Sequence, residues 1–269
     1  MLSAVAGFNP VADTPLVILI AHRGASHDAP ENTLAAIQLG WQQADAVEID
    51  VQLTFDRVPV IIHDANTRRT CKVNRIVRTQ SYSELQRLDA GRWKHPRWRG
   101  QTIPTLRDVL HDQPKNKRLF IEIKPREGFP EAWKALQSHC PAGSKNIIFL
   151  SEHLPTLSVM RERFPAHSYL WIPPVSRKIA KSKPDLIWQA WIQAARLPRL
   201  HGIAVDYRHH ITSESVRLAH DASLAVFVWT VNETAAARRL VTAGVDGVIT
   251  NRPAWIRKHL KPLRRLAAK

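Results

Sequence analysis

The residues that could do chemistry lie at the ends of three apolar runs near the start of the chain. They are His22 and Arg23 after Leu16–Ala21, Glu48 and Asp50 within Ala46–Val51, and His63 after Val58–Ile62. Short apolar runs bounded by polar residues are typical of buried strands. An acid–base pair, oxygen ligands for a hard cation and a fixed positive charge are the parts that phosphoryl transfer requires.

The carboxylates point to a cation site. Glu48 and Asp50 are two residues apart, so a strand places both on one face, where they would repel each other without a cation or a proton. The same arrangement returns as E-I-K around Glu122 on the next predicted barrel strand. Three carboxylates suit Mg²⁺ or Ca²⁺ better than zinc or copper. Alternatively, Glu48 or Asp50 forms a salt bridge with Arg23 or Lys124.

Histidine is the natural proton carrier near neutral pH, so we expect His22 and His63 to be catalytic. In a site with two cations they would instead bind metal. Arg23 can hold a phosphate oxygen by a forked contact and Lys124 can add a point charge. Trp229 lies near the end of a later predicted strand and is either a substrate contact at the mouth of the site or part of the core.

Strands and helices then alternate along the chain. Further strands are predicted at Arg118–Ile123, Asn146–Leu150, His167–Ile172, Gly202–Tyr207, Leu224–Val231 and Gly247–Thr250. Helices are predicted at Leu106–His111, Pro130–His139, Leu154–Phe164, Pro184–Leu197, Ser213–Asp221, Glu233–Ala243 and Pro253–Leu260, and a first one begins after Asn32 or Thr33. Eight such units favour an α/β fold of the TIM (β/α)8 type, with the site at the C-terminal ends of the strands. An open doubly wound sheet is the alternative, but its G-x-G-x-x-G motif is absent.

One stretch interrupts this pattern after the second strand. Gln52–Pro59 resembles a hairpin turn, and residues 64–104 are polar and basic, with a short helix near Tyr82–Leu88. We interpret residues 52–104, approximately, as a small insertion over one end of the barrel. A barrel of this kind needs about 250 residues, so the 269-residue chain is expected to be a single domain, 1–269.

The chain is strongly basic, with a net charge of +16. Residues 57–99 hold eleven Arg or Lys against three acids, and Arg252–Lys269 holds seven basic residues and no acid. Each segment is either a solvated surface or an attraction for anionic partners. No run reaches the length of a membrane span, and the start lacks a basic signal region, so we expect a cytoplasmic protein. Cys71 and Cys140 show no metal or redox spacing, so no disulfide is expected.

These motifs resemble the glycerophosphodiester phosphodiesterases, a family of metal-dependent TIM-barrel enzymes. The matching segments are H-R-G-A-S-H-D-A-P-E-N-T, V-E-I-D-V-Q-L-T, V-P-V-I-I-H-D, L-D-A-G, I-P-T-L, I-E-I-K, W-T-V-N and G-V-D-G-V-I-T-N-R-P. The resemblance implies a divalent cation on Glu48, Asp50 and Glu122, and His22 and His63 as general acid and base. It also implies that Arg23 and Lys124 bind phosphate.

The chain departs from the family pattern at two places. The last strand is followed by Asn251, where the family usually has an aspartate, and the stretch after Asp64 is unusually basic.

The expected reaction is hydrolysis of a small glycerophosphodiester to sn-glycerol 3-phosphate and an alcohol. One alternative is lysophospholipase D activity, for which Trp93 and Trp98 are candidate acyl-chain contacts. The other is a noncatalytic binder of anionic surfaces or nucleic acid, although no specific nucleic-acid partner is expected. The sequence leaves the choice of Mg²⁺ or Ca²⁺ and the oligomeric state open.

Overall fold

The computed structural model describes residues 17–137, 146–174 and 184–260. Eight parallel strands form the central sheet: β1 (Ile18–His22), β2 (Ala46–Leu53), β4 (Arg118–Ile123), β5 (Ile147–Ser151), β6 (Ser168–Trp171), β7 (Gly202–Asp206), β8 (Ala225–Trp229) and β9 (Gly247–Thr250). Because β1 pairs with β9 on one side and with β2 on the other, the sheet closes on itself. The fold is a TIM barrel, as the sequence predicted.

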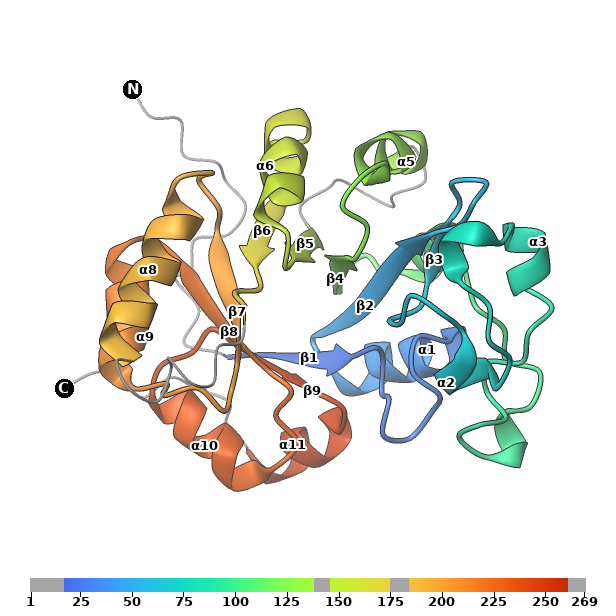
Figure 1. Cartoon of the computed structure of the whole chain (residues 1–269). Helices are drawn as coiled ribbons and strands as arrows, with labels where there is room; N and C mark the ends of the chain where they lie inside the picture. Colours follow the sequence, from blue (N-terminus) through green and yellow to red (C-terminus); the bar gives the residue numbers. More distant parts are fainter. Residues whose placement is uncertain (1–16, 138–145, 175–183, 261–269) are drawn as a thin grey trace.

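Helices surround this barrel (Figure 1). They are α1 (Leu34–Gln43), α4 (Leu106–Asp112), α5 (Phe129–Leu136), α6 (Leu154–Arg163), α8 (Pro184–Arg196), α9 (Ser213–Asp221), α10 (Thr234–Thr242) and α11 (Pro253–His259). Where they are described, the predicted elements agree with these bounds to within about two residues. Leu16 and the end of the helix predicted at Pro130–His139 lie outside the described residues.

Side chains of the strands contribute to two hydrophobic cores, one between the barrel and the helices and one inside the barrel. Outward-facing side chains pack under the helices, and an inner cluster that includes Ile20, Phe120 and Phe227 fills the barrel. Phe120 and Phe227 meet edge to face, with ring centroids 5.4 Å apart. With the interior filled at this level, polar side chains have room only at the strand ends.

The chain after β2 forms the predicted hairpin and insertion. β3 (Pro59–Ile61) returns antiparallel to β2, with Val51 opposite Ile61. The insertion has a small core of its own: Val60, Ile62, Cys71, Val77, Leu85, Ala90 and Ile103. Around this core lie α3 (Tyr82–Leu85), two short 3-10 turns (Val77–Thr79 and Pro96–Trp98) and α2 (Arg68–Cys71), a four-residue helix that the sequence did not predict.

Among the described residues, no helix combines the length and the apolar character that crossing a bilayer requires. Cys71 is a buried free thiol, and Cys140 lies outside the described residues. The basic C-terminal segment is described only as far as Leu260. Within that part, Arg257 forms an ion pair with Asp45 at 2.5 Å.

Candidate active site

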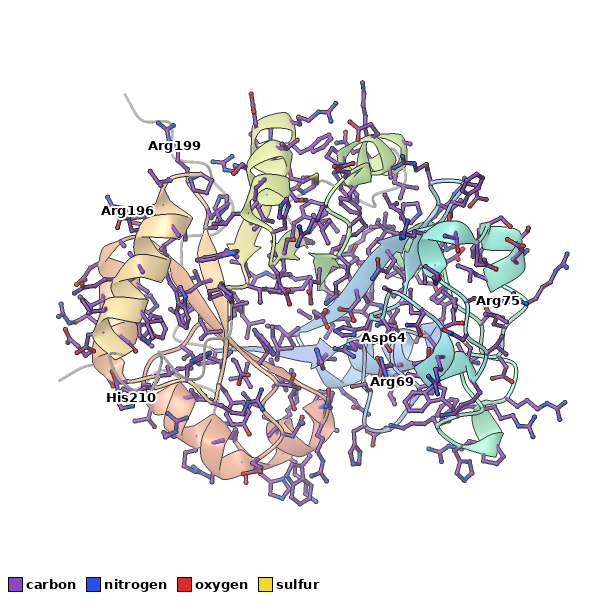
Figure 2. All side chains as sticks on the ribbon, in the orientation of Figure 1. Asp64, Arg69, Arg75, Arg196, Arg199 and His210 are labelled. Atoms are coloured by element: carbon purple, nitrogen blue, oxygen red, sulfur yellow. The ribbon has the colours of Figure 1, made fainter. Side chains whose placement is uncertain are left out.

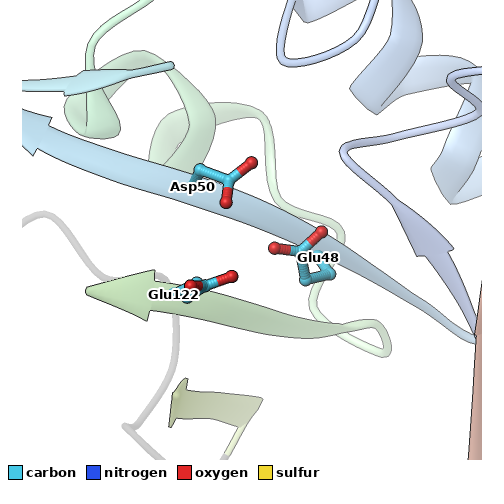
Figure 3. A group of neighbouring side chains, drawn as sticks. All are labelled: Glu48, Asp50 and Glu122. Atoms are coloured by element: carbon cyan, nitrogen blue, oxygen red, sulfur yellow. The ribbon is translucent and has the colours of Figure 1, made fainter. Parts of the chain in front are cut away.

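Three carboxylates from two neighbouring strands meet inside one end of the barrel (Figure 3). The register places Asp50 of β2 beside Glu122 of β4, and Glu48 lies one strand repeat before Asp50 on the same face. One oxygen from each carboxylate lies within 4.8 Å of the others. Glu48 and Asp50 are buried, and the Glu122 side chain is 13% exposed. The predicted cluster is therefore assembled by the fold.

The three acids differ in their partners. Asp50 forms ion pairs with Arg23 Nε and Lys124 Nζ, each at 3.1 Å. It also accepts a hydrogen bond from Asn32 at 2.8 Å. Although burial opposes ionisation, Lys124 and Arg23 outweigh it and lower the pKa of Asp50.

The pKa values of Glu48 and Glu122 shift in the opposite direction. Burial, reinforced by the charges of Asp50 and Glu122, raises the pKa of Glu48 well above its usual value. Burial and the charge of Asp50 raise the pKa of Glu122 to about 7, although Lys124 lies 2.5 Å away. Two of the three carboxylates therefore lack enough compensating positive charge.

This imbalance fits a divalent cation. Glu48 Oε1 is buried and has no hydrogen-bond partner within the described part of the chain. A buried acceptor without a partner is costly, and a cation would satisfy it. The ion pairs that the sequence offered as an alternative are also present, since Asp50 contacts both Arg23 and Lys124. The pairs leave Glu48 unsatisfied, so they do not replace the cation.

The first histidine ends β1 beside these acids. His22 Nδ1 lies 2.7 Å from Asn251 Oδ1, and its Nε2 lies 3.9 Å from Glu48 Oε2. Ser26 Oγ also donates to Asn251 Oδ1, at 3.0 Å. Nδ1 of His22 therefore carries the hydrogen, and Nε2 is left with a lone pair. Burial, and secondly the charge of Arg23, lower the pKa of His22 to about 4.

The second histidine follows β3 and is part of an ionic chain. His63 Nδ1 lies 2.7 Å from Asp64, and Asp64 is held by Arg69 at 2.8 Å. Arg69 also forks onto Glu31, which accepts from Arg23 at 2.8 Å. This series of ion pairs therefore links the segment after His22 to the segment after His63 through the guanidinium of Arg69 in α2. Figure 2 shows Asp64 and Arg69 close together beside this end of the barrel.

A cavity of about 90 Å³ opens onto the cluster. Seven of the eight residues that the sequence assigned to the site line it: His22, Arg23, Glu48, His63, Glu122, Lys124 and Trp229. The eighth, Asp50, is fully buried behind them. Trp229 lines the cavity and also packs against the inner core cluster, and its indole donates a hydrogen bond to the carbonyl of Ala204. Asp206, another acid at a strand end, pairs with Arg208 and does not line this cavity.

Comparison with known proteins identifies the family. The model of the glycerophosphoryl diester phosphodiesterase family matches residues 22–255, from the first histidine to the last helix. The chain belongs to this family.

Similar proteins cover nearly the whole chain. A glycerophosphodiester phosphodiesterase of Caldanaerobacter subterraneus is 30% identical over 88% of this chain and 94% of its own length. An Oleispira antarctica phosphodiesterase, solved with the product sn-glycerol-3-phosphate, is 31% identical, covers 91% of this chain and 96% of its own, and superposes with a TM-score of 0.80. A glycerophosphodiester phosphodiesterase from Agrobacterium tumefaciens is 26% identical over 90% of this chain, with a TM-score of 0.74.

Some members of the site were not assigned from the sequence. Glu31 and Asn32 belong to a segment that was interpreted as a helix start and as part of a family motif, with no role given to either residue; Thr33 does cap that helix. Asn32 has a positive φ of 57°, and this turns its amide onto Asp50. Arg69 was counted only as part of a basic stretch. Glu152 also lines the cavity, and no local pattern in the sequence marks it.

Proposed function

We propose that this protein hydrolyses glycerophosphodiesters to sn-glycerol 3-phosphate and an alcohol, with a divalent cation held by Glu48, Asp50 and Glu122. The observation that carries the proposal is a cluster of three carboxylates beside one cavity, whose lining includes two of these carboxylates and both histidines. The neighbour from Oleispira antarctica, solved with sn-glycerol-3-phosphate, supports the glycerol phosphate half of the substrate.

Mg²⁺ or Ca²⁺ is the proposed cation, because both prefer oxygen ligands. When bound, the cation supplies a Lewis acid that polarises the phosphate and offsets the charge that develops during displacement. Arg23 and Lys124 already lie beside Asp50, so they add positive charge to the same end of the cavity. We assign them to the non-bridging phosphate oxygens, and Trp229 to the wall against which the substrate packs.

The two histidines are proposed to divide the proton transfers. His22 keeps its hydrogen on Nδ1 toward Asn251, so Nε2 can accept a proton from the attacking hydroxyl. His63 Nδ1 contacts Asp64, which orients the ring, and we assign His63 to give a proton to the leaving alkoxide. The attacking hydroxyl belongs to water or to the neighbouring glycerol carbon.

Small diesters are favoured over lysophospholipids by the surroundings of two tryptophans. Trp93 is partly buried and donates its indole hydrogen to Ala90, and Trp98 is partly buried beside Arg97. Neither lines the cavity that holds the histidines. A purely noncatalytic binder would have no use for buried acids at strand ends, so binding alone does not account for the site.

The proposed catalytic unit is one domain, residues 1–269, with an insertion at approximately 52–104. The separate small core of the insertion and the extent of the family match support this division.

The proposal is tested by measuring glycerol 3-phosphate release from glycerophosphocholine, glycerophosphoethanolamine and glycerophosphoglycerol. Each reaction is run in chelator and then with added Mg²⁺ or Ca²⁺. We expect release that requires a cation and is lost in His22→Ala and His63→Ala. Turnover that persists after complete cation removal would refute the metal assignment, and no release from any diester would refute the substrate class.

A further inference from the structure

The insertion carries a large excess of positive charge on its surface. Of the eleven Arg and Lys side chains between residues 57 and 99, all except Lys94 are exposed. The three acids of the same segment are engaged locally. Asp64 holds Arg69, Glu84 accepts from Ser81 in a capping box, and Asp89 accepts from backbone amides including Arg92.

This excess is not balanced by neighbouring elements. Among the described residues, Arg69 is the one member of the eleven that forms a direct ion pair with a carboxylate. The other nine exposed cations therefore leave their charge uncompensated at the surface, where it attracts anionic partners most strongly at low salt. Charge alone does not say which anionic partner fits.

Two exposed apolar side chains indicate which kind of anionic partner fits this surface. Residues 72–76 are five consecutive exposed residues, in which Val73 is 43% and Ile76 is 48% exposed. Lys72 and Arg75 lie next to them in the chain. We call residues 72–76 the basic tip. Figure 2 shows Arg75 at the outer edge of the molecule, pointing away from the barrel.

Hydrogen bonds to Thr67 hold the backbone of the basic tip in place. Thr67 donates through Oγ1 to the carbonyl of Val73 at 2.5 Å and accepts the amide hydrogen of Arg75 at 3.1 Å. The amide of Thr67 also donates to the Arg75 carbonyl at 3.0 Å. These bonds hold the backbone while its apolar side chains stay in water, so docking would not have to order the tip first.

The insertion is also fastened to the mouth of the active site. Lys94 donates to the carbonyl of Ser26 and Arg97 to the carbonyl of Asp28, both in the loop after β1. Arg69 ties α2 to Glu31 in the same loop. The insertion that carries the basic tip is therefore held against a loop at the end of the barrel where the cavity opens.

We propose that the basic tip docks the protein on an anionic lipid surface, with Val73 and Ile76 entering the boundary between headgroups and acyl chains. Cations next to exposed aliphatic side chains match such a surface, which offers negative charge and an apolar layer beneath it. Nucleic acid fits less well, because the tip offers no aromatic side chain on which a base could stack.

The test is cosedimentation with vesicles of phosphatidylglycerol and phosphatidylcholine, compared with phosphatidylcholine alone. We expect binding only to the anionic vesicles, weakening with added salt. The variant Lys72→Gln/Arg75→Gln should bind about 10-fold more weakly. Its matched control is Arg196→Gln/Arg199→Gln, which removes two exposed cations on the far side (Figure 2) and should bind as the wild type does.

A second variant tests the apolar contact. Val73→Ser/Ile76→Ser should weaken vesicle binding by about 5- to 10-fold and leave binding to a DNA oligonucleotide unchanged. Its control is Leu197→Ser, at an apolar side chain that is 81% exposed elsewhere. All variants should keep the wild-type midpoint of urea unfolding, which shows that they fold.

Three results would overturn the docking proposal: equal binding to both vesicle types, equal losses in the two cation variants, or unchanged vesicle binding in Val73→Ser/Ile76→Ser. Tighter binding to DNA than to anionic vesicles would overturn it as well. Because the readout is binding, the outcome does not depend on the proposed reaction.

Discussion

Asn251 accepts a hydrogen bond from His22 at 2.7 Å, and this contact joins residues at opposite ends of the barrel sequence. An amide oxygen fixes the ring tautomer without adding charge, so His22 stays neutral in a partly buried position. In Asn251→Asp a carboxylate would take the same place, and opposite charge favours the protonated ring. We expect the acidic limb of the pH profile of kcat/KM to move up by about one unit, with little loss of maximal rate.

Asn251→Leu provides the contrast, since it removes the acceptor and adds no charge. The tautomer is then no longer fixed, so kcat should fall by about 10-fold or more, with a smaller change in KM. If Asn251→Asp leaves the pH profile unmoved while Asn251→Leu is fully active, the amide does not position His22.

His201, a histidine outside the active site, makes the free energy of unfolding depend on pH. His201 Nδ1 accepts the amide hydrogen of Tyr169 at 3.1 Å, which requires an unprotonated ring nitrogen. Burial, and then Arg161, lower the pKa of His201 to about 4. The unfolded chain takes up a proton near pH 6.5 and the folded chain does not, so stability is lost as the pH falls from 6.5 toward 4.

His201→Asn should flatten this dependence, because an amide oxygen can accept the same bond without titrating. Relative to that variant, the wild type should lose about 1 to 2 kcal/mol of unfolding free energy between pH 7 and pH 5. Urea unfolding at both pH values measures it. His111→Asn, at an exposed histidine, is the control and should follow the wild type. Parallel slopes for wild type and His201→Asn would contradict the prediction.

Local patterns were sufficient for the strands and for the acids on them. Glu48 and Asp50 share a face because strand side chains alternate, and Asp50 meets Glu122 because the two strands start in register, with Ala46 beside Arg118. The contact of Asn251 with His22 spans 229 residues and depends on closure of the barrel, which no local pattern encodes. Similarly, α2 is too short and too polar to show a helical period, so the position of Arg69 could not be predicted.

Arg69 should matter for catalysis although it lies outside the cavity. Its guanidinium contacts Asp64 and Glu31 together, so it holds the loop of His63 against the loop of Arg23. Lysine cannot make both forked contacts. We expect Arg69→Lys to lower kcat about 10-fold and to change KM less.

Arg68→Lys is the matched control, because Arg68 is exposed and forms no ion pair among the described residues. Steady-state kinetics with glycerophosphocholine at low and moderate salt measure both variants. Equal rates for Arg69→Lys and Arg68→Lys would show that the bridge is not needed to position the site.

Glu48 should show opposite effects on stability and activity. Its carboxylate is buried beside Asp50 and Glu122, and its pKa is raised, so ionising it costs folding free energy. Stability of the cation-free protein should therefore fall as the pH rises from the unfolded value near 4.5 toward the higher folded value. Glu48→Gln keeps an acceptor for the amide of Arg23 and removes the charge. In chelator at pH 8 it should be about 1 to 2 kcal/mol more stable than the wild type, and at pH 5 the difference should shrink.

The same substitution removes a proposed cation ligand. Wild-type protein should gain stability when Mg²⁺ or Ca²⁺ is added, since a ligand of the folded state stabilises it by mass action. Glu48→Gln should gain much less and should lose about 100-fold or more in glycerol 3-phosphate release. Glu162→Gln, at an exposed acid of α6, should match the wild type in both measurements. If the cation stabilises Glu48→Gln as much as the wild type, Glu48 is not a ligand.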